Sequence, residues 1–382
     1  MSNKTNPLVK KNEKISRKIV CGIIIGFLLV AMIPMIRYII NSNIEPPEKK
    51  VLAFYYTWYG NQTDYTNTDL GIVDPGGASW WHWNDEEFPN PTPSGYTGTN
   101  APTLGLYDSS DPDLIETHFT MAKEAGIDAF ICTWWGSGGR EDINFNNLFQ
   151  MAENLSTSIK LCPYFETNQL RYNNESDISK IIEDISSEVK YILGKYSDSP
   201  YFFKERGKPV IFFYTTALFN PLIWNKIISN IKNEYDCTLI ADVAAVSEPR
   251  TELFSSFDGV HIYNPTWTID TLRGLTGDPS TFGSIADNYR SMALTCRSYN
   301  KICALTTIPG YDDRVIRDPG ILIERENGDT YDYLWDKCLV GDWVLITSFN
   351  EWHEGTDIEP SEEYGNYYLN RTKEWSDIFK GS

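Results

Sequence analysis

The sequence predicts a (β/α)8 TIM barrel preceded by an N-terminal transmembrane helix, and three observations indicate this fold class. Eight short apolar runs recur along the chain, helical stretches separate them, and one uncharged segment stands near the start. Continuous apolar runs are typical of parallel strands that are buried on both faces. The predicted strands are residues 51–59, 128–135, 160–165, 209–214, 238–243, 259–263, 302–307 and 343–349.

Helical periodicity fills several of the intervals between these runs, as the alternation of strand and helix in a barrel requires. A doubly wound open sheet is the alternative arrangement. That fold carries a glycine-rich dinucleotide-binding turn after its first strand, and this chain has none. The sequence therefore favours a closed barrel. The clearest predicted helices are residues 112–125, 178–193, 221–234 and 284–299.

The uncharged segment, residues 19–36, is just long enough for one membrane span. The basic residues 1–18 before it predict a cytoplasmic tail. We expect a signal anchor over residues 19–40, a polar stalk over 41–50, and a catalytic barrel domain over 51–382 on the extracytosolic side. That side is the Golgi lumen in a eukaryote and the cell exterior in a prokaryote. A cleaved signal peptide is the competing interpretation, but no small-x-small cleavage site follows the apolar run.

Charge and composition restrict the classes of ligand. The net charge of −19 opposes binding to phosphate backbones, so no nucleic-acid partner is expected. Aromatic residues make up 14% of the chain. Because aromatic rings stack on the apolar faces of sugars, this excess fits a carbohydrate cleft, and it fits a large core equally well.

The cysteine pattern gives no support for a zinc site. None of the seven cysteines forms a CxxC pair, and Cys132, Cys162 and Cys303 fall within predicted strands, where a thiol acts as a small buried hydrophobe. The HEGT sequence that begins at His353 is not the HExxH zinc motif. We expect neither a metal nor a cofactor, and the oligomeric state is left open.

The most informative segment is residues 348–359, SFNEWHEGTDIE, at the end of the last predicted strand. Barrel enzymes keep their chemistry at the carboxyl ends of the strands. Glu351 and Glu354 stand three residues apart there, with Trp352 between them. Glycoside hydrolysis needs such a pair of carboxylic acids, one to move a proton on the sugar and one to protonate the leaving oxygen. A solvated surface turn is the alternative, but it has no need of Trp352.

Most of the other predicted strands also end in aromatic or polar side chains, which a barrel would gather on the same rim. His261 lies within a strand and is interpreted as an inward-facing barrel residue. His353 stands between the two acids and could hold one of them by a hydrogen bond. The side chains at the strand ends include Tyr55, Tyr56, Trp58, Tyr59, Thr133, Trp134, Trp135, Tyr164, Glu166, Tyr214, Asp242, Tyr263, Asn264, Tyr311 and Asn350.

Six segments of the chain resemble the motifs of one known family. They are FYYTWYG at 54–60, HWN at 82–84, TWWGSG at 133–138, FDGVHIYN at 257–264, PGYDDRVIR at 309–317 and SFNEWHEGTDIE at 348–359. The family is glycoside hydrolase family 99, which comprises the endo-α-1,2-mannosidases and endo-α-1,2-mannanases. The loop at 163–171, PYFETNQLR, differs from the family pattern and carries an extra acid, Glu166.

The resemblance implies a retaining, endo-acting glycoside hydrolase that cleaves α-mannosidic linkages next to an α-1,2-linked mannose in a glycan. It also implies a 1,2-anhydro sugar intermediate in place of a glycosyl-enzyme. Glu351 would take the proton of the sugar's own 2-hydroxyl, and Glu354 would protonate the leaving oxygen and later activate water. The residues expected to contact the sugar are Tyr55, Tyr56, Trp134, Trp135, Tyr263, Tyr311, Arg317, Asn350, Trp352 and His353.

Two other functional classes are alternatives. A membrane-anchored glycan-binding or polysaccharide-assembly protein with a related barrel would keep the cleft, but a pure lectin has no need of a protonated acid. A glycosyltransferase with one membrane span would show a DxD metal motif. Asp111 and Asp113 have that spacing, but they open a predicted helix, where Asp is a common N-cap.

Overall fold

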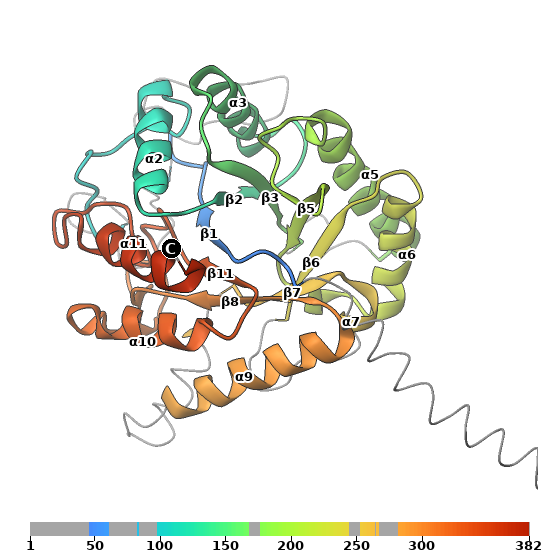
Figure 1. The fold of residues 1–382 in the computed structure, drawn as a ribbon. Coiled ribbons are helices and arrows are strands. Elements are labelled where there is room, and N and C mark those ends of the chain that lie inside the picture. Colours follow the sequence, from blue (N-terminus) through green and yellow to red (C-terminus); the bar gives the residue numbers. More distant parts are fainter. Residues whose placement is uncertain are drawn as a thin grey trace, which may run out of the picture. The chain divides into compact units, whose positions relative to one another are not determined.

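Eight parallel strands close into a barrel in the computed structural model (Figure 1). The structure describes residues 46–60, 82–83, 98–167, 176–243, 253–263, 265–266 and 282–381. Each strand pairs with the next along the ring, β3 pairs with β5, and the last strand pairs with β1. The strands are β1 (Lys50–Tyr55), β2 (Ala129–Trp134), β3 (Lys160–Phe165), β5 (Lys208–Phe213), β6 (Thr238–Asp242), β7 (Gly259–His261), β8 (Ile302–Thr307) and β11 (Trp343–Ile346).

Helices follow the strands in the chain and surround the ring of strands in Figure 1. Their apolar faces cover the outer face of the barrel, so the strands are buried on both sides. The side chain of Asp111 caps α2 by accepting from the Asp113 N–H at 2.9 Å, as the sequence predicts. The helices are α2 (Pro112–Glu124), α3 (Arg140–Leu155), α5 (Ile178–Tyr196), α6 (Pro221–Lys232), α7 (Leu253–Ser256), α9 (Phe282–Tyr299), α10 (Asp329–Cys338) and α11 (Tyr367–Lys380).

Short elements decorate the ends of the barrel. β4 (Lys204–Glu205) pairs antiparallel with β5, and the 3-10 turns η2 (Thr216–Leu218) and η4 (Glu326–Gly328) precede α6 and α10. The connection after β8 forms a two-stranded hairpin of β9 (Tyr311–Asp312) and β10 (Leu322–Ile323). No sequence pattern predicted this hairpin, which carries several side chains of the site described below.

The eight predicted strands and the four predicted helices are all present, which confirms the closed barrel. The first and last strands are shorter than predicted and end at Tyr55 and Ile346. The last strand stops early because the Ser348 N–H donates to the Thr356 carbonyl at 2.8 Å, which folds the chain back on itself. His261 lies inside the barrel as predicted, with Nε2 at 3.1 Å from the Phe213 carbonyl oxygen.

The six cysteines from Cys132 onward are free and buried, as expected for small hydrophobic residues. No helix within the described ranges has the length and apolar character to cross a membrane. The predicted tail (1–18) and anchor (19–40), and residues 41–45 of the stalk (41–50), lie outside the described residues.

Candidate active site

The loop that follows β11 holds both predicted catalytic acids, and short-range hydrogen bonds fix its shape. Ser348 Oγ accepts from the Glu351 N–H at 2.7 Å and lies 2.9 Å from the Thr356 hydroxyl oxygen. The Thr356 N–H donates to the Glu351 carbonyl at 3.3 Å. The two carboxyl groups therefore project from a closed, ordered turn at the carboxyl end of the barrel.

Asn350 and Trp352 anchor this turn to the rest of the barrel. The Asn350 amide forms two hydrogen bonds with the Tyr56 backbone, at 2.8 and 3.0 Å. Trp352 Nε1 donates to the Tyr107 hydroxyl at 2.9 Å. Both side chains are fully buried. Their predicted role was sugar contact, but the structure places them within the protein, where they hold the loop.

Glu351 is buried, and its two carboxylate oxygens have different surroundings. Oε1 accepts from the His353 N–H at 3.1 Å and lies 3.3 Å from His353 Nδ1. Oε2 is buried and has no hydrogen-bond partner among the residues that the structure describes. A buried oxygen of this kind retains its full capacity to accept a proton from a substrate hydroxyl.

Glu354 is the second acid, and its side chain is 15% exposed. The Arg317 Nη1 and Nη2 atoms both lie 3.1 Å from Glu354 Oε1, and the Tyr263 hydroxyl donates to Oε2 at 3.3 Å. Burial, followed by the neighbouring Glu351 carboxylate, raises the pKa of Glu354 to about 7, and Arg317 opposes this rise. Glu354 therefore carries a proton in a large share of molecules near neutral pH.

Aromatic hydroxyl groups surround Glu354. The hydroxyl groups of Tyr56 and Tyr263 are hydrogen-bonded to each other, and both side chains are largely buried. Arg317 Nη1 donates to the Tyr311 hydroxyl at 2.8 Å and to Asp313 Oδ2 at 2.6 Å. The β9–β10 hairpin thus orients the guanidinium group that contacts Glu354.

A cavity of about 390 Å³ opens next to Glu354. Its volume falls within the range of small-molecule sites. The ends of β5 and β6 contribute Tyr214 and Asp242 to its wall, which the sequence placed at the rim but not among the sugar contacts. The hairpin segment contributes Tyr311 and Arg317, both of which were expected to contact the sugar. The lining residues are Tyr214, Thr215, Asp242, Ile262, Tyr263, Thr266, Tyr311, Asp313, Arg317, Ile321 and Glu354.

Glu166, the extra acid after β3, is buried, and its charge acts on Tyr214, which lines this cavity. Burial, followed by the Asp242 carboxylate, raises its pKa well above the ordinary value for a glutamic acid. Glu166 thus adds to the acidic character of this side of the rim.

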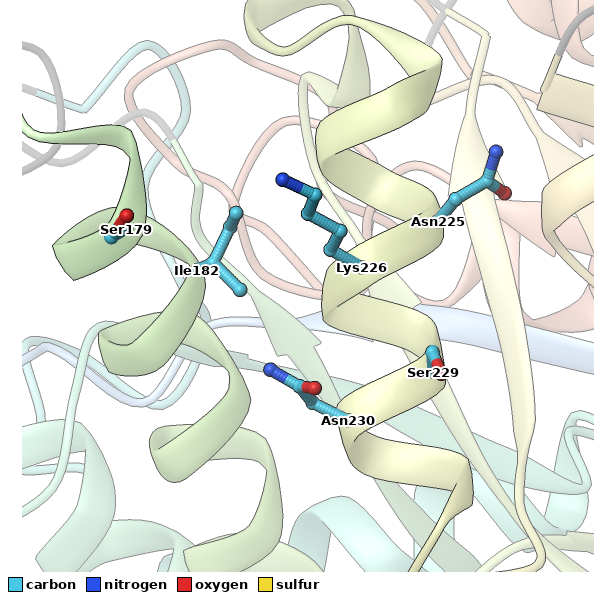
Figure 2. Close-up of a pocket in the computed structure, with 6 residues that line it drawn as sticks. All are labelled: Ser179, Ile182, Asn225, Lys226, Ser229 and Asn230. Atoms are coloured by element: carbon cyan, nitrogen blue, oxygen red, sulfur yellow. The ribbon is translucent and has the colours of Figure 1, made fainter.

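A second hollow lies on the outside of the barrel, between α5 and α6 (Figure 2). It measures about 430 Å³, and the residues that line it are Ser179, Ile182, Asn225, Lys226, Ser229 and Asn230. No carboxyl group is among these described lining residues, so this hollow has no acid for glycoside chemistry. The rim cavity contains Glu354 at the carboxyl ends of the strands and is the candidate active site.

Two predicted sugar contacts point away from the cavity. The Tyr55 hydroxyl lies 2.9 Å from His118 Nδ1 on α2, and its ring stacks on Phe130. Trp134 is fully buried, and its ring packs near Tyr191 of α5. Since successive side chains of a strand point to opposite faces, the neighbouring residues Tyr56 and Trp135 take the inner face. The structure brings Tyr56 to the site, while Trp135 lies at the rim and is 38% exposed.

A parallel barrel with two acids at its rim and an aromatic-lined cavity beside them defines a glycoside hydrolase. The model of Glycosyl hydrolase family 99 matches residues 46–381, so the chain belongs to that family. The resemblance predicted from the sequence is confirmed.

Similar proteins include two curated relatives from mammals. The glycoprotein endo-α-1,2-mannosidase of Mus musculus is 26% identical over 379 residues, which cover 89% of this chain and 77% of the relative. The glycoprotein endo-α-1,2-mannosidase-like protein of Homo sapiens is 27% identical over 365 residues, which cover 86% of this chain and 75% of the relative. A solved family 99 endo-α-mannosidase from Bacteroides thetaiotaomicron, in complex with Bis-Tris propane, is 28% identical with a TM-score of 0.69 and covers 87% of this chain and 97% of that one.

Proposed function

We propose that this protein is a retaining, endo-acting α-mannosidase that cleaves next to an α-1,2-linked mannose in a glycan, with the sugar's 2-hydroxyl as the nucleophile. Membership of family 99 and the names of the relatives support an endo-α-mannosidase activity. The observation that carries the mechanism is the contrast between the two acids. Glu351 has a buried, unpartnered Oε2 among the described residues, whereas the pKa of Glu354 is raised to about 7.

In the first step, Glu351 acts as the base and Glu354 as the acid. A 2-hydroxyl is a weak nucleophile, so it needs a carboxylate to accept its proton while its oxygen attacks C1. The bond from C1 to the leaving oxygen breaks, and that oxygen takes the proton of Glu354. The product is a 1,2-anhydro sugar, with Glu351 protonated and Glu354 ionised.

In the second step, the two acids exchange roles. Glu354 removes a proton from water as the water oxygen attacks C1, and Glu351 returns its proton to O2 as the three-membered ring opens. Each acid ends in its starting state, as microscopic reversibility requires. Two displacements at C1 retain the configuration of the sugar.

The proposed partner is a mannose-containing oligosaccharide or glycan. The cavity offers hydroxyl, carboxylate and guanidinium groups from Tyr214, Asp242 and Arg317, which suit the hydroxyl groups of a neutral sugar. A glycan-binding protein without hydrolysis is less well supported, because it would not need a carboxyl group with the raised pKa of Glu354.

We further propose a single membrane span over residues 19–40, with the catalytic domain on the extracytosolic side. The uncharged run and its basic flank support this topology. An anchored enzyme would act on glycans that are present in a lumen or at a cell exterior.

Product analysis tests the proposed activity. The full-length chain is incubated with α-1,2-linked manno-oligosaccharides, either plain or capped with glucose, and the first products are followed by NMR. We expect internal cleavage and an α-anomer as the initial product. Release of single terminal mannose residues, or an initial β-anomer, would contradict the proposal.

A further inference from the structure

Arg325 is a buried arginine at the end of the β9–β10 hairpin, and the mechanism proposed above does not use it. Its side chain is 8% exposed, and it is not among the described residues that line the rim cavity. Burying a guanidinium group is costly unless both its charge and its donors have partners. The partners of Arg325 therefore indicate its role.

The guanidinium group of Arg325 binds the loop that carries Glu354. Its Nη2 atom donates to the carbonyl oxygens of Gly355 and Asp357, at 3.0 Å in each case. The same nitrogen lies 3.1 Å from Asp357 Oδ1, which is an ion-pair contact. Arg325 thus binds the backbone directly after Glu354 at two points.

Packing fixes the position of this guanidinium group. The ring centroids of Tyr364 and Tyr368 lie 4.4 and 4.6 Å from its Cζ atom, which are distances typical of cation–π contacts. A Cβ atom added at Gly310 would lie 2.5 Å from Arg325 Cγ, so the stem of the side chain packs closely against the start of the hairpin segment. Because the side chain has little room to move, it also holds the two carbonyl groups that it binds.

The hairpin also binds Glu354 itself. The Asp312 N–H of β9 donates to the Glu354 carbonyl at 2.8 Å, and Arg317 Nη1 lies 3.1 Å from Glu354 Oε1. The next residue, Gly355, has a φ of +57°, which residues with a side chain rarely adopt. The hairpin therefore holds the backbone on both sides of this turn. Glu351 differs, because its N–H and one of its carboxylate oxygens are bound within its own loop.

We propose that Arg325 is a positioning residue for Glu354, because it sets the path of the loop after Glu354 and thereby the place of the carboxyl group. This inference rests on the proposed role of Glu354 as the acid. Arginine suits this role, since one planar group binds two carbonyl oxygens while it stacks against aromatic rings, whereas the ammonium group of lysine is a compact point charge.

Kinetics on two kinds of substrate separate positioning from a purely structural role. Arg325→Met in the full-length chain should lower kcat on a natural glycan by about 10- to 100-fold with KM little changed, because a misplaced catalytic group is a poor proton donor. An aryl glycoside with a good leaving group should lose far less, since it needs little proton donation. Equal losses on the two substrates, or no loss on the natural glycan, would overturn the inference.

Arg371→Met is the matched control. Arg371 Nε donates to Asp332 Oδ1 at 3.0 Å and so joins α11 to α10. This variant loses an ion pair, as Arg325→Met does, but its kcat should match that of the wild type on both substrates. A loss in the control that depends on the leaving group in the same way would also overturn the inference.

A double-mutant cycle tests whether Arg325 acts through Glu354. In the Glu354→Gln background there is no acid to position, so Arg325→Met should cause little further loss of kcat on the natural glycan. If the two losses multiplied in full, the residues would act independently and the inference would be wrong. Should Arg325→Met fail to fold, Arg325→Lys takes its place in both experiments, because it keeps a cation beside Asp357 but lacks the branched group that binds two carbonyl oxygens.

Crystal structures of the full-length wild type and Arg325→Lys give a measurement that needs no turnover. We expect the Gly355 carbonyl and the Glu354 carboxyl group to shift together in the variant, by about 1 Å. A loop that stays in place would overturn the inference, even in an active mannosidase. Equal losses on the two substrates in Glu354→Gln alone would instead overturn the proposed acid, which is a result separate from the position of the loop.

Discussion

Both terminal nitrogens of Arg317 lie 3.1 Å from one oxygen of Glu354, and the other oxygen faces the Tyr263 hydroxyl. Arg317 favours the ionised form of Glu354, while burial and Glu351 favour the protonated form. The balance gives a pKa of about 7, which suits a group that must donate a proton in one step and accept one in the next.

Replacing Arg317 should therefore shift the pH dependence of the reaction. The pKa of Glu354 is already raised, and Arg317→Gln removes the main effect that lowers it, so the pKa should rise further. The loss of kcat/KM at alkaline pH, where Glu354 gives up its proton, should move to higher pH by up to about one unit, because Arg317 is half exposed and screened.

The pH profile of kcat/KM on a natural glycan measures this shift. Arg314→Gln is the matched control, because Arg314 pairs with Asp312 and is 57% exposed. Its profile should match that of the wild type. If the alkaline loss of kcat/KM moved to lower pH in Arg317→Gln, this result would contradict the electrostatic account.

The role of Glu354 as an acid predicts that the effect of its loss depends on the leaving group. Glu354→Gln should lower kcat on a natural glycan by about 10²- to 10⁴-fold, because the amide donates no proton to the leaving oxygen. An aryl glycoside with a good leaving group should lose far less, since it needs little proton help. Steady-state kinetics on both substrates, with exposed Glu362→Gln as a control, decide this. Equal losses on the two substrates would refute the assignment.

The adjacent tyrosines Tyr55 and Tyr56 should respond differently to the same change. Tyr55→Phe should leave kcat/KM close to that of the wild type and lower the free energy of unfolding by about 1 kcal/mol, because His118 loses a buried hydrogen-bond partner. Tyr56→Phe should lower kcat/KM by about five- to tenfold, since its hydroxyl supports Tyr263 beside Glu354. Chemical denaturation and kinetics of both variants measure the contrast. A larger loss of kcat/KM in Tyr55→Phe than in Tyr56→Phe would mean that the side of β1 that carries Tyr55 faces the site, which would contradict the assignment.

Removal of residues 1–44 should give a soluble and active domain. The barrel begins at Lys50, and its strands and helices lie beyond the deleted segment. Expression of the truncated chain, sedimentation without detergent and a glycosidase assay check this expectation. Aggregation, or an inactive truncated chain, would count against the division into an anchor and a barrel domain.

Much of the fold could be predicted because a parallel barrel leaves a strong pattern in the sequence. Each strand is buried on both faces, so it appears as an apolar run, and each run ends where the rim begins. Glu351 and Glu354 could be placed for the same reason, since they follow the last run directly. The phase of the strands was harder to predict: a fully apolar run does not reveal which of Tyr55 and Tyr56, or of Trp134 and Trp135, faces inward.

The inward turn of Asn350, Trp352 and His353 could not be predicted either. Their orientation depends on partners far away in the sequence, namely the Tyr56 backbone, the Tyr107 hydroxyl and the His82 carbonyl. The residues next to these positions in the sequence do not reveal such long-range contacts. The β9–β10 hairpin was missed because each of its strands has only two residues, too few for a period to be recognised.

The central claim is that the sugar's own 2-hydroxyl attacks C1 with help from Glu351. The most direct test is mass spectrometry after incubation with a substrate whose 2-hydroxyl is replaced by fluorine. An ordinary retaining glycosidase would be trapped as a covalent ester by such a substrate, because its nucleophile is a carboxylate. Here we predict binding without cleavage and without a labelled peptide, and Glu351→Gln should be inactive even on a normal substrate with a good leaving group. A labelled peptide that contains Glu351 would contradict the account.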